Sequence, residues 1–168
     1  MMGRLQDKVT VVTGAGNGIG RATALRFAEE GSSVIAADIQ IDKADETVQI
    51  IEDNGGNAKS ISVDVTSGAD NDAMAELAVS HFGGLDYLVT AAGISHANYV
   101  SGDIEPDIKN IIENRATYLE RPGWEFVEAD PESFDKVLNV SLIQIYEPTR
   151  TTPIAGCGVW VGRGGGGG

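Results

Sequence analysis

Four glycines grouped at one junction of the chain suggest phosphate chemistry. Residues 13–20 read Thr-Gly-Ala-Gly-Asn-Gly-Ile-Gly and lie between an apolar run at 9–12 and helix-forming residues at 21–30. Glycines at a strand-to-helix junction allow a tight turn and let backbone N–H groups approach a pyrophosphate. The positive end of the following helix would then attract the anion. The plain alternative is a structural turn that binds nothing.

A carboxylate follows at the end of the second apolar run. Asp38 comes directly after residues 33–37, and its distance from Gly20 is close to the roughly 20 residues expected of a ribose-binding acid. Its carboxylate would accept hydrogen bonds from the ribose hydroxyls and repel a 2′-phosphate. Neither Asn17 nor Ile39 supplies a basic side chain for that phosphate. The pattern favours NAD over NADP, although Asp38 could also be an ordinary solvated residue at a strand end.

Strands and helices alternate through the first ninety residues or so. This alternation predicts an α/β fold, a doubly wound parallel sheet of the Rossmann-like kind with helices on both faces. Ligands of such sheets bind beyond the carboxyl ends of the strands, where Gly14, Asp38, Asp64 and Gly93 all fall. Strands are expected at 9–12, 33–37, 59–63 and 85–89, and helices at 21–30, 42–53 and 70–82.

The remainder of the chain is less regular. We predict one dinucleotide-binding domain over residues 1–142, in which 95–130 form a long polar connection with a candidate helix at 104–119. A further helix is expected to begin within 131–140. Residues 143–168 are glycine-rich and low in charge, which predicts a tail rather than an ordered continuation. The sheet is therefore expected to be incomplete on its C-terminal side.

Composition narrows the classes of partner. The 168-residue chain carries a formal net charge of −13, which opposes binding to nucleic acids and to anionic membrane surfaces. No apolar run approaches the ~20 residues of a membrane span, and residues 1–8 lack the apolar segment of a signal peptide. Cys157 is the single cysteine, and His81 and His96 have no partners at metal-ligand spacing. We expect a cytoplasmic protein without a metal site.

These motifs together resemble the short-chain dehydrogenase/reductase family. The matching residues are the turn at 13–20, Asp64-Val65, the Thr-Ala-Ala-Gly sequence at 90–93, and Asn139 within 136–140. Their order and spacing match from about residue 5 to residue 142, apart from the long connection after Gly93. The resemblance implies a nicotinamide cofactor and a small alcohol or ketone substrate.

The resemblance also implies roles for single residues. Asp64 would bond the adenine amino group with Val65 beside the ring, although Asp-Val-Thr after a strand equally makes an Asx turn and helix cap. Asn139 would hold a water in a proton relay and is the one catalytic candidate, while Thr90 replaces an asparagine that ties adjacent strands together in the family. The expected cofactor-binding residues are Gly14, Asn17, Gly18, Ile19, Gly20, Asp38, Ile39, Asp64, Val65, Ala92 and Gly93, the last two lining the ribose.

The family's catalytic Tyr-x-x-x-Lys pair is absent from this sequence. Tyr146 with Arg150 is the nearest imitation, but arginine stays charged and cannot replace a tuned lysine amine. One hypothesis is an NAD(H)-dependent oxidoreductase of the short-chain type that is truncated and inactive as this chain alone. The alternative is a non-catalytic NAD-binding or partner module. An incomplete sheet would expose an edge and an apolar face, so self-association is expected.

Overall fold

The computed structural model describes residues 3–94, 132 and 135–140 of the chain. The connection at 95–130, its candidate helix at 104–119, the tail at 143–168, and Tyr146 with Arg150 lie outside the described residues. Residues 132 and 135–140 are helical, as expected for the helix that begins within 131–140. The elements in chain order are β1 (Val9–Thr13), α1 (Gly18–Glu29), β2 (Ser33–Asp38), α2 (Ile41–Asp53), β3 (Asn57–Ser62), α3 (Gly68–Phe82) and β4 (Tyr87–Thr90).

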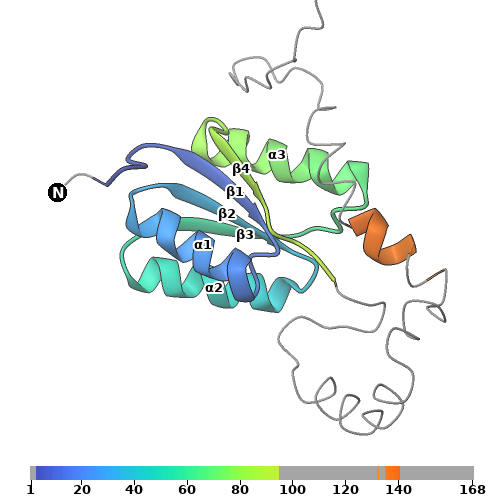
Figure 1. Cartoon of the computed structure of the whole chain (residues 1–168). Helices are drawn as coiled ribbons and strands as arrows, with labels where there is room; N and C mark the ends of the chain where they lie inside the picture. Colours follow the sequence, from blue (N-terminus) through green and yellow to red (C-terminus); the bar gives the residue numbers. More distant parts are fainter. Residues whose placement is uncertain (1–2, 95–131, 133–134, 141–168) are drawn as a thin grey trace, which may run out of the picture.

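The four strands form one parallel sheet. Their order is β3-β2-β1-β4, and each neighbouring pair runs parallel. Helices α1 and α2 cover one face of this sheet and α3 covers the other (Figure 1). The predicted fold class, a doubly wound α/β sheet, is therefore confirmed.

Two apolar layers hold the helices onto the sheet. Strands β1 and β2 are buried on both faces, so they read as continuous apolar runs rather than alternating ones. Towards α1 and α2, Val12 and Val34 pack with Val48 of α2. Towards α3, Val11 and Ile35 pack with Met74. Successive strand residues thus point to opposite helical layers, as the pleat of a strand requires.

The predicted start of the first helix is wrong. The helix-forming residues at 21–30 predict a start at residue 21, but α1 begins at Gly18. The side chain of Asn17 accepts the backbone N–H of Gly18 at 2.7 Å and caps the helix there. The glycine-rich sequence therefore continues into the first turn of α1.

Other boundaries shift for similar local reasons. Helix α3 begins at Gly68 because Ser67 caps it, and it ends at Phe82, after which Gly83 with a φ of 86° forms the C-terminal cap. Strand β4 begins at Tyr87, because the side chain of the preceding residue, Asp86, is hydrogen-bonded to the start of β1. The Asp86 carboxylate accepts the N–H of Val9 and the ammonium of Lys8, each at 2.9 Å.

Strand β4 is the most exposed part of the sheet. Within the part of the chain that the structure describes, β4 pairs with β1 alone. Tyr87 is 44% exposed and Leu88 is 37% exposed, whereas the residues of β1 are buried. Among these described residues, no helix has both the length and the apolar composition needed to cross a membrane.

Candidate functional site

The carboxyl ends of the strands bring the predicted site segments to one edge of the sheet. Gly14 follows β1, Asp38 ends β2, Asp64 follows β3 and Gly93 follows β4. Because all neighbouring strands are parallel, these four positions share an edge. The roles predicted for the individual side chains remain predictions.

The glycine turn requires glycine for three different reasons. Gly14 has φ +66°, and a methyl group on it would lie 2.8 Å from the Ala91 carbonyl oxygen. A methyl on Gly20 would lie 2.0 Å from the carbonyl oxygen of Gly14, so its absence lets α1 approach the turn. Gly18 has φ +52°, and no atom of the described residues lies within 4 Å of a methyl position on it. The space beside Gly18 is therefore open.

The N-terminal end of α1 faces that open space. The first-turn N–H groups of a helix lack intrahelical partners and attract negative charge. Gly18 and Ile19 are exposed there, and the Ile19 side chain is 81% exposed. Asn17 occupies the Gly18 N–H with its own side chain. An apolar side chain beside the first-turn backbone donors suits a ligand with both an anionic and an aromatic part.

Asp38 lies against the glycine turn. One carboxylate oxygen accepts the backbone N–H of Gly16 at 2.8 Å, and the other accepts that of Gln40 at 2.9 Å. A carboxylate offers about four lone-pair sites, so acceptor capacity remains for further hydroxyl donors. Ile39, the next residue, is 66% exposed.

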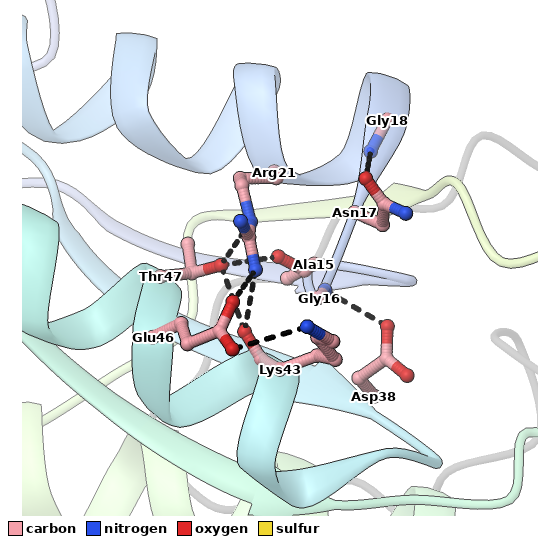
Figure 2. A network of polar contacts seen from close by, with 9 residues as sticks. All are labelled: Ala15, Gly16, Asn17, Gly18, Arg21, Asp38, Lys43, Glu46 and Thr47. Atoms are coloured by element: carbon pink, nitrogen blue, oxygen red, sulfur yellow. Dashed lines mark hydrogen bonds and ion pairs between the residues drawn. The ribbon is translucent and has the colours of Figure 1, made fainter. Parts of the chain in front are cut away.

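Helix α2 supplies a polar network that sequence reasoning missed (Figure 2). The Thr47 hydroxyl donates to the Ala15 carbonyl at 2.8 Å and accepts the Arg21 Nε–H at 3.0 Å. Glu46 pairs with Arg21 at 2.8 Å and with Lys43 at 3.1 Å, and hydrogen bonds from Arg21 and then Lys43 lower the pKa of Glu46. In the sequence, Thr47 can be recognised as a polar residue on the buried face of an amphipathic helix, which it shares with Ala44, Val48 and Ile51.

Lys43 is a cation close to Asp38 that the sequence analysis did not weigh. A methyl group on Gly16 would lie 2.7 Å from both the Asp38 Oδ2 atom and the Lys43 Cβ atom. Both side chains therefore flank the same stretch of backbone. The Lys43 ammonium itself is directed to Glu46 (Figure 2).

The Asp64 carboxylate makes the Asx turn that was the structural alternative for it. Its Oδ1 atom accepts the backbone N–H of Thr66 at 2.9 Å and the Thr66 hydroxyl at 2.7 Å. The Asp64 N–H donates to Asp70 at 2.9 Å. Val65 is 8% exposed and packs in the apolar layer under α3. An adenine ring could therefore contact only its backbone or the small exposed part of its side chain. An adenine contact stays a prediction for both residues.

The Thr13 side chain ties β1 to the segment that follows β4. The Thr13 hydroxyl oxygen accepts the backbone N–H groups of Ala91 and Ala92, at 3.1 and 3.3 Å. Thr90 itself is exposed, as is Gly93, and no atom of the described part of the chain lies within 4 Å of a methyl position on Gly93. The segment after β4 is thus held from β1.

The catalytic candidate Asn139 lies apart from the glycine turn in sequence. It is exposed on the helical residues 135–140, and its neighbour Val140 packs against the apolar layer under α3. Among residues 3–94, 132 and 135–140, no three His, Cys, Asp or Glu side chains are grouped to hold a metal ion.

Comparison with known proteins identifies the family. The family model described as short chain dehydrogenase matches residues 8–117. The chain belongs to the short-chain dehydrogenase family. Curated relatives include the uncharacterized oxidoreductase YxbG of Bacillus subtilis, 45% identical over 93 residues, which are 55% of this chain and 34% of the relative. The 7alpha-hydroxysteroid dehydrogenase of Escherichia coli is 42% identical over 90 residues, 54% of this chain and 35% of that protein.

Solved short-chain dehydrogenases share the fold. A short chain dehydrogenase from Mycobacterium avium is 32% identical with a TM-score of 0.65, over 84% of this chain and 43% of that one. The 3-ketoacyl-(acyl-carrier-protein) reductase of Brucella melitensis, complexed with NADH, is 31% identical with a TM-score of 0.63, over 87% of this chain and 48% of that one. This short-chain dehydrogenase chain spans about a third to a half of the length of these relatives.

Proposed function

We propose that this chain binds NAD(H) at the carboxyl edge of its sheet, as the cofactor-binding part of a short-chain oxidoreductase acting on an alcohol or carbonyl substrate. The observation that carries the proposal is the 2.8 Å hydrogen bond from the Gly16 N–H to Asp38. This bond supports the proposal because it joins a carboxylate that would bind the ribose to a turn that would bind the pyrophosphate. The NADH complex of the Brucella melitensis reductase supports the same cofactor class.

The residues present fit a dinucleotide. The open space beside Gly18 admits a phosphate, and the first turn of α1 offers it backbone donors. The exposed side chains of Ile19 and Ile39 provide apolar surface on either side of Asp38 and the turn. Ala92 and Gly93 would line the ribose, and Asp64 with Val65 would lie at the adenine. A bound cofactor that covers the side chains of Ile19 and Ile39 would remove their exposed apolar area from water.

Asp38 favours NAD over NADP. A 2′-phosphate would lie against the Asp38 carboxylate and be repelled by it. The backbone N–H groups of Gly16 and Gln40 already donate to Asp38. Lys43 is the nearby cation that could offset this repulsion, but its ammonium is paired with Glu46 at 3.1 Å. Arg21 is likewise paired with Glu46, at 2.8 Å, so neither of these cations is directed to Asp38, whose carboxylate disfavours the additional phosphate.

Bound NAD(H) supplies or accepts the hydride that interconverts an alcohol and a carbonyl. The chain's own residues bind and orient: the turn at residues 14–20 holds the pyrophosphate, Asp38 holds the ribose, and Asn139 positions a water for proton transfer. The sequence contains no Tyr-x-x-x-Lys pair to exchange the substrate proton. We therefore propose that this 168-residue chain does not turn over substrate by itself.

A non-catalytic NAD-binding module is the second candidate. It is favoured by the absence of a Tyr-x-x-x-Lys pair from these 168 residues. Both candidates share the cofactor site and differ in whether a catalytic half acts with this chain.

Titration of the purified chain with NADH and with NADPH, followed by nicotinamide fluorescence, tests the proposal. We expect saturable NADH binding and NADPH binding weaker by about tenfold or more, equivalent to about 1.4 kcal/mol. A chain that binds neither nucleotide would overturn the proposed function. Hydride transfer assays across a panel of alcohols and ketones then address activity, and clear turnover would show that a proton-transferring group has been overlooked.

A further inference from the structure

The peptide bond between Ala15 and Gly16 is held at both of its polar ends. Its carbonyl oxygen accepts the Thr47 hydroxyl at 2.8 Å, and its N–H donates to Asp38 at 2.8 Å. The two partners come from α2 and β2, which are separate elements (Figure 2). The preceding N–H, that of Ala15, donates to the Ala37 carbonyl at 3.1 Å. The centre of the glycine turn therefore has its orientation set from outside the turn.

The hydrogen-bond geometry of Thr47 leaves its hydroxyl few alternatives. A hydroxyl has one proton to donate, and the Ala15 carbonyl at 2.8 Å is closer than the Lys43 carbonyl at 3.1 Å. Arg21 donates to the same hydroxyl oxygen at 3.0 Å. Thr47 is 0% exposed, so water cannot replace these partners. The Thr47 hydroxyl is therefore held on the Ala15 carbonyl of the glycine turn.

Arg21 keeps this arrangement in place from α1. Its terminal nitrogen donates to the Lys43 carbonyl at 3.1 Å and pairs with Glu46 at 2.8 Å. Thr47 is thereby linked both to the first helix and to the glycine turn that precedes it. Helix α2 and the turn cannot shift relative to each other without breaking several bonds.

We propose that Thr47 is a positioning residue that, together with Asp38, fixes the Ala15–Gly16 peptide and so aims the pyrophosphate-binding N–H groups of the turn. A peptide next to glycine rotates easily because no Cβ opposes it. Rotation would turn the Ala15 carbonyl away from Thr47 and towards the Asp38 carboxylate, where two oxygens repel. The inference rests on the proposed NAD(H) site, and it adds a residue from α2 to that site.

Thr47→Val is the informative substitution, because valine keeps the branched shape and removes the hydroxyl. We expect NADH to bind about tenfold more weakly, while Thr47→Ser, which keeps the hydroxyl, binds as the unsubstituted chain does. Thr10→Val is the matched control. Thr10 is also 0% exposed, and its hydroxyl bonds Ser32 at 2.8 Å near the amino ends of β1 and β2. That variant should lose stability without losing NADH affinity.

A second measurement needs no cofactor. In ¹H–¹⁵N spectra of the chain alone, Thr47→Val should shift the Gly16 amide resonance, and Thr10→Val should leave that resonance unchanged. An unshifted Gly16 amide, or equal losses of NADH affinity in the two valine variants, would overturn the positioning role. If the unsubstituted chain does not bind NADH while the Gly16 amide responds as expected, the proposed cofactor fails and the control of the turn by Thr47 stands.

Discussion

Asp38 at the end of β2 accepts the backbone N–H of Gly16 in the glycine turn at 2.8 Å. This bond joins the residue that would select the ribose to the backbone that would hold the phosphates. Their proximity follows from strand order, since β1 and β2 are neighbours in the sheet. The bond shows that Asp38 supports the turn, in addition to its proposed role in recognising the nucleotide.

Asp38→Ala is expected to weaken NADH binding by about tenfold and to relax the discrimination against NADPH. Both effects follow from removing the carboxylate, which would accept the ribose hydroxyls and repel a 2′-phosphate. Fluorescence titration with each nucleotide measures them. Asp72→Ala, an exposed carboxylate on α3, is the control and should change neither affinity. An unchanged NADPH to NADH ratio in Asp38→Ala would remove Asp38 from the site.

Two substitutions should distinguish a glycine that is needed for helix packing from a glycine that leaves room for a ligand. Gly20→Ala places a methyl 2.0 Å from the Gly14 carbonyl oxygen, so α1 must move and the chain should lose about 1–3 kcal/mol of stability. Gly18→Ala places a methyl in open space at φ +52°, where the backbone cost is about 1–2 kcal/mol. Urea unfolding and NADH titration measure both variants. Gly18→Ala should still fold and bind NADH poorly; intact binding would argue that no phosphate lies there.

Thr13→Val tests the tie between β1 and the segment after β4. Valine cannot accept the N–H groups of Ala91 and Ala92, which are partly buried, so stability should fall by about 1–3 kcal/mol. Thr90→Val, on an exposed side chain, should change stability by less than about 0.5 kcal/mol. Urea unfolding of both variants distinguishes the positions. Equal effects would mean that Thr13 is not the tie.

We expect the stability of the folded chain to fall in acid because of Glu30. Its hydrogen bonds with the backbone and then the side chain of Arg4 lower its pKa from 4.5 to about 2. Because the pKa is lower in the folded chain, this contribution is complete above pH 4.5 and is lost as the pH falls towards about 2. Melting temperatures measured across that range should fall less steeply in Glu30→Gln. Parallel curves for the two chains would contradict the assignment.

The exposed edge strand predicts self-association. Tyr87 and Leu88 of β4 are exposed apolar residues, and the strand pairs with β1 alone within the described residues. Such an edge is a template for pairing with another chain, and charge on it opposes that pairing. Leu88→Lys should therefore lower the sedimentation-velocity molecular mass of the concentrated chain. A monomeric unsubstituted chain at the same concentration would refute the prediction.

Local signals in the sequence were sufficient to predict the fold, and they also predict where the candidate site lies. Apolar runs of strand length, helix-forming stretches between them and glycines at the junctions predict a parallel sheet with its ligand edge at Gly14, Asp38, Asp64 and Gly93. These signals work because each depends on residues close together in the chain. The start of α1 was misplaced because the poor helix propensity of Gly18 and Gly20 hid the capping effect of Asn17.

Contacts between distant residues were decided only by the tertiary structure. The Thr47 hydroxyl on the Ala15 carbonyl, the Thr13 tie to Ala91 and the anchor from Asp86 to Val9 each join segments that folding brings together. Sequence spacing cannot predict such bonds, because a hydroxyl or carboxylate has many possible partners until burial removes water as one of them. The sequence determined which chemistry this edge of the sheet could support. The packing of α2 and β1 around the glycine turn determined which side chains hold it in position.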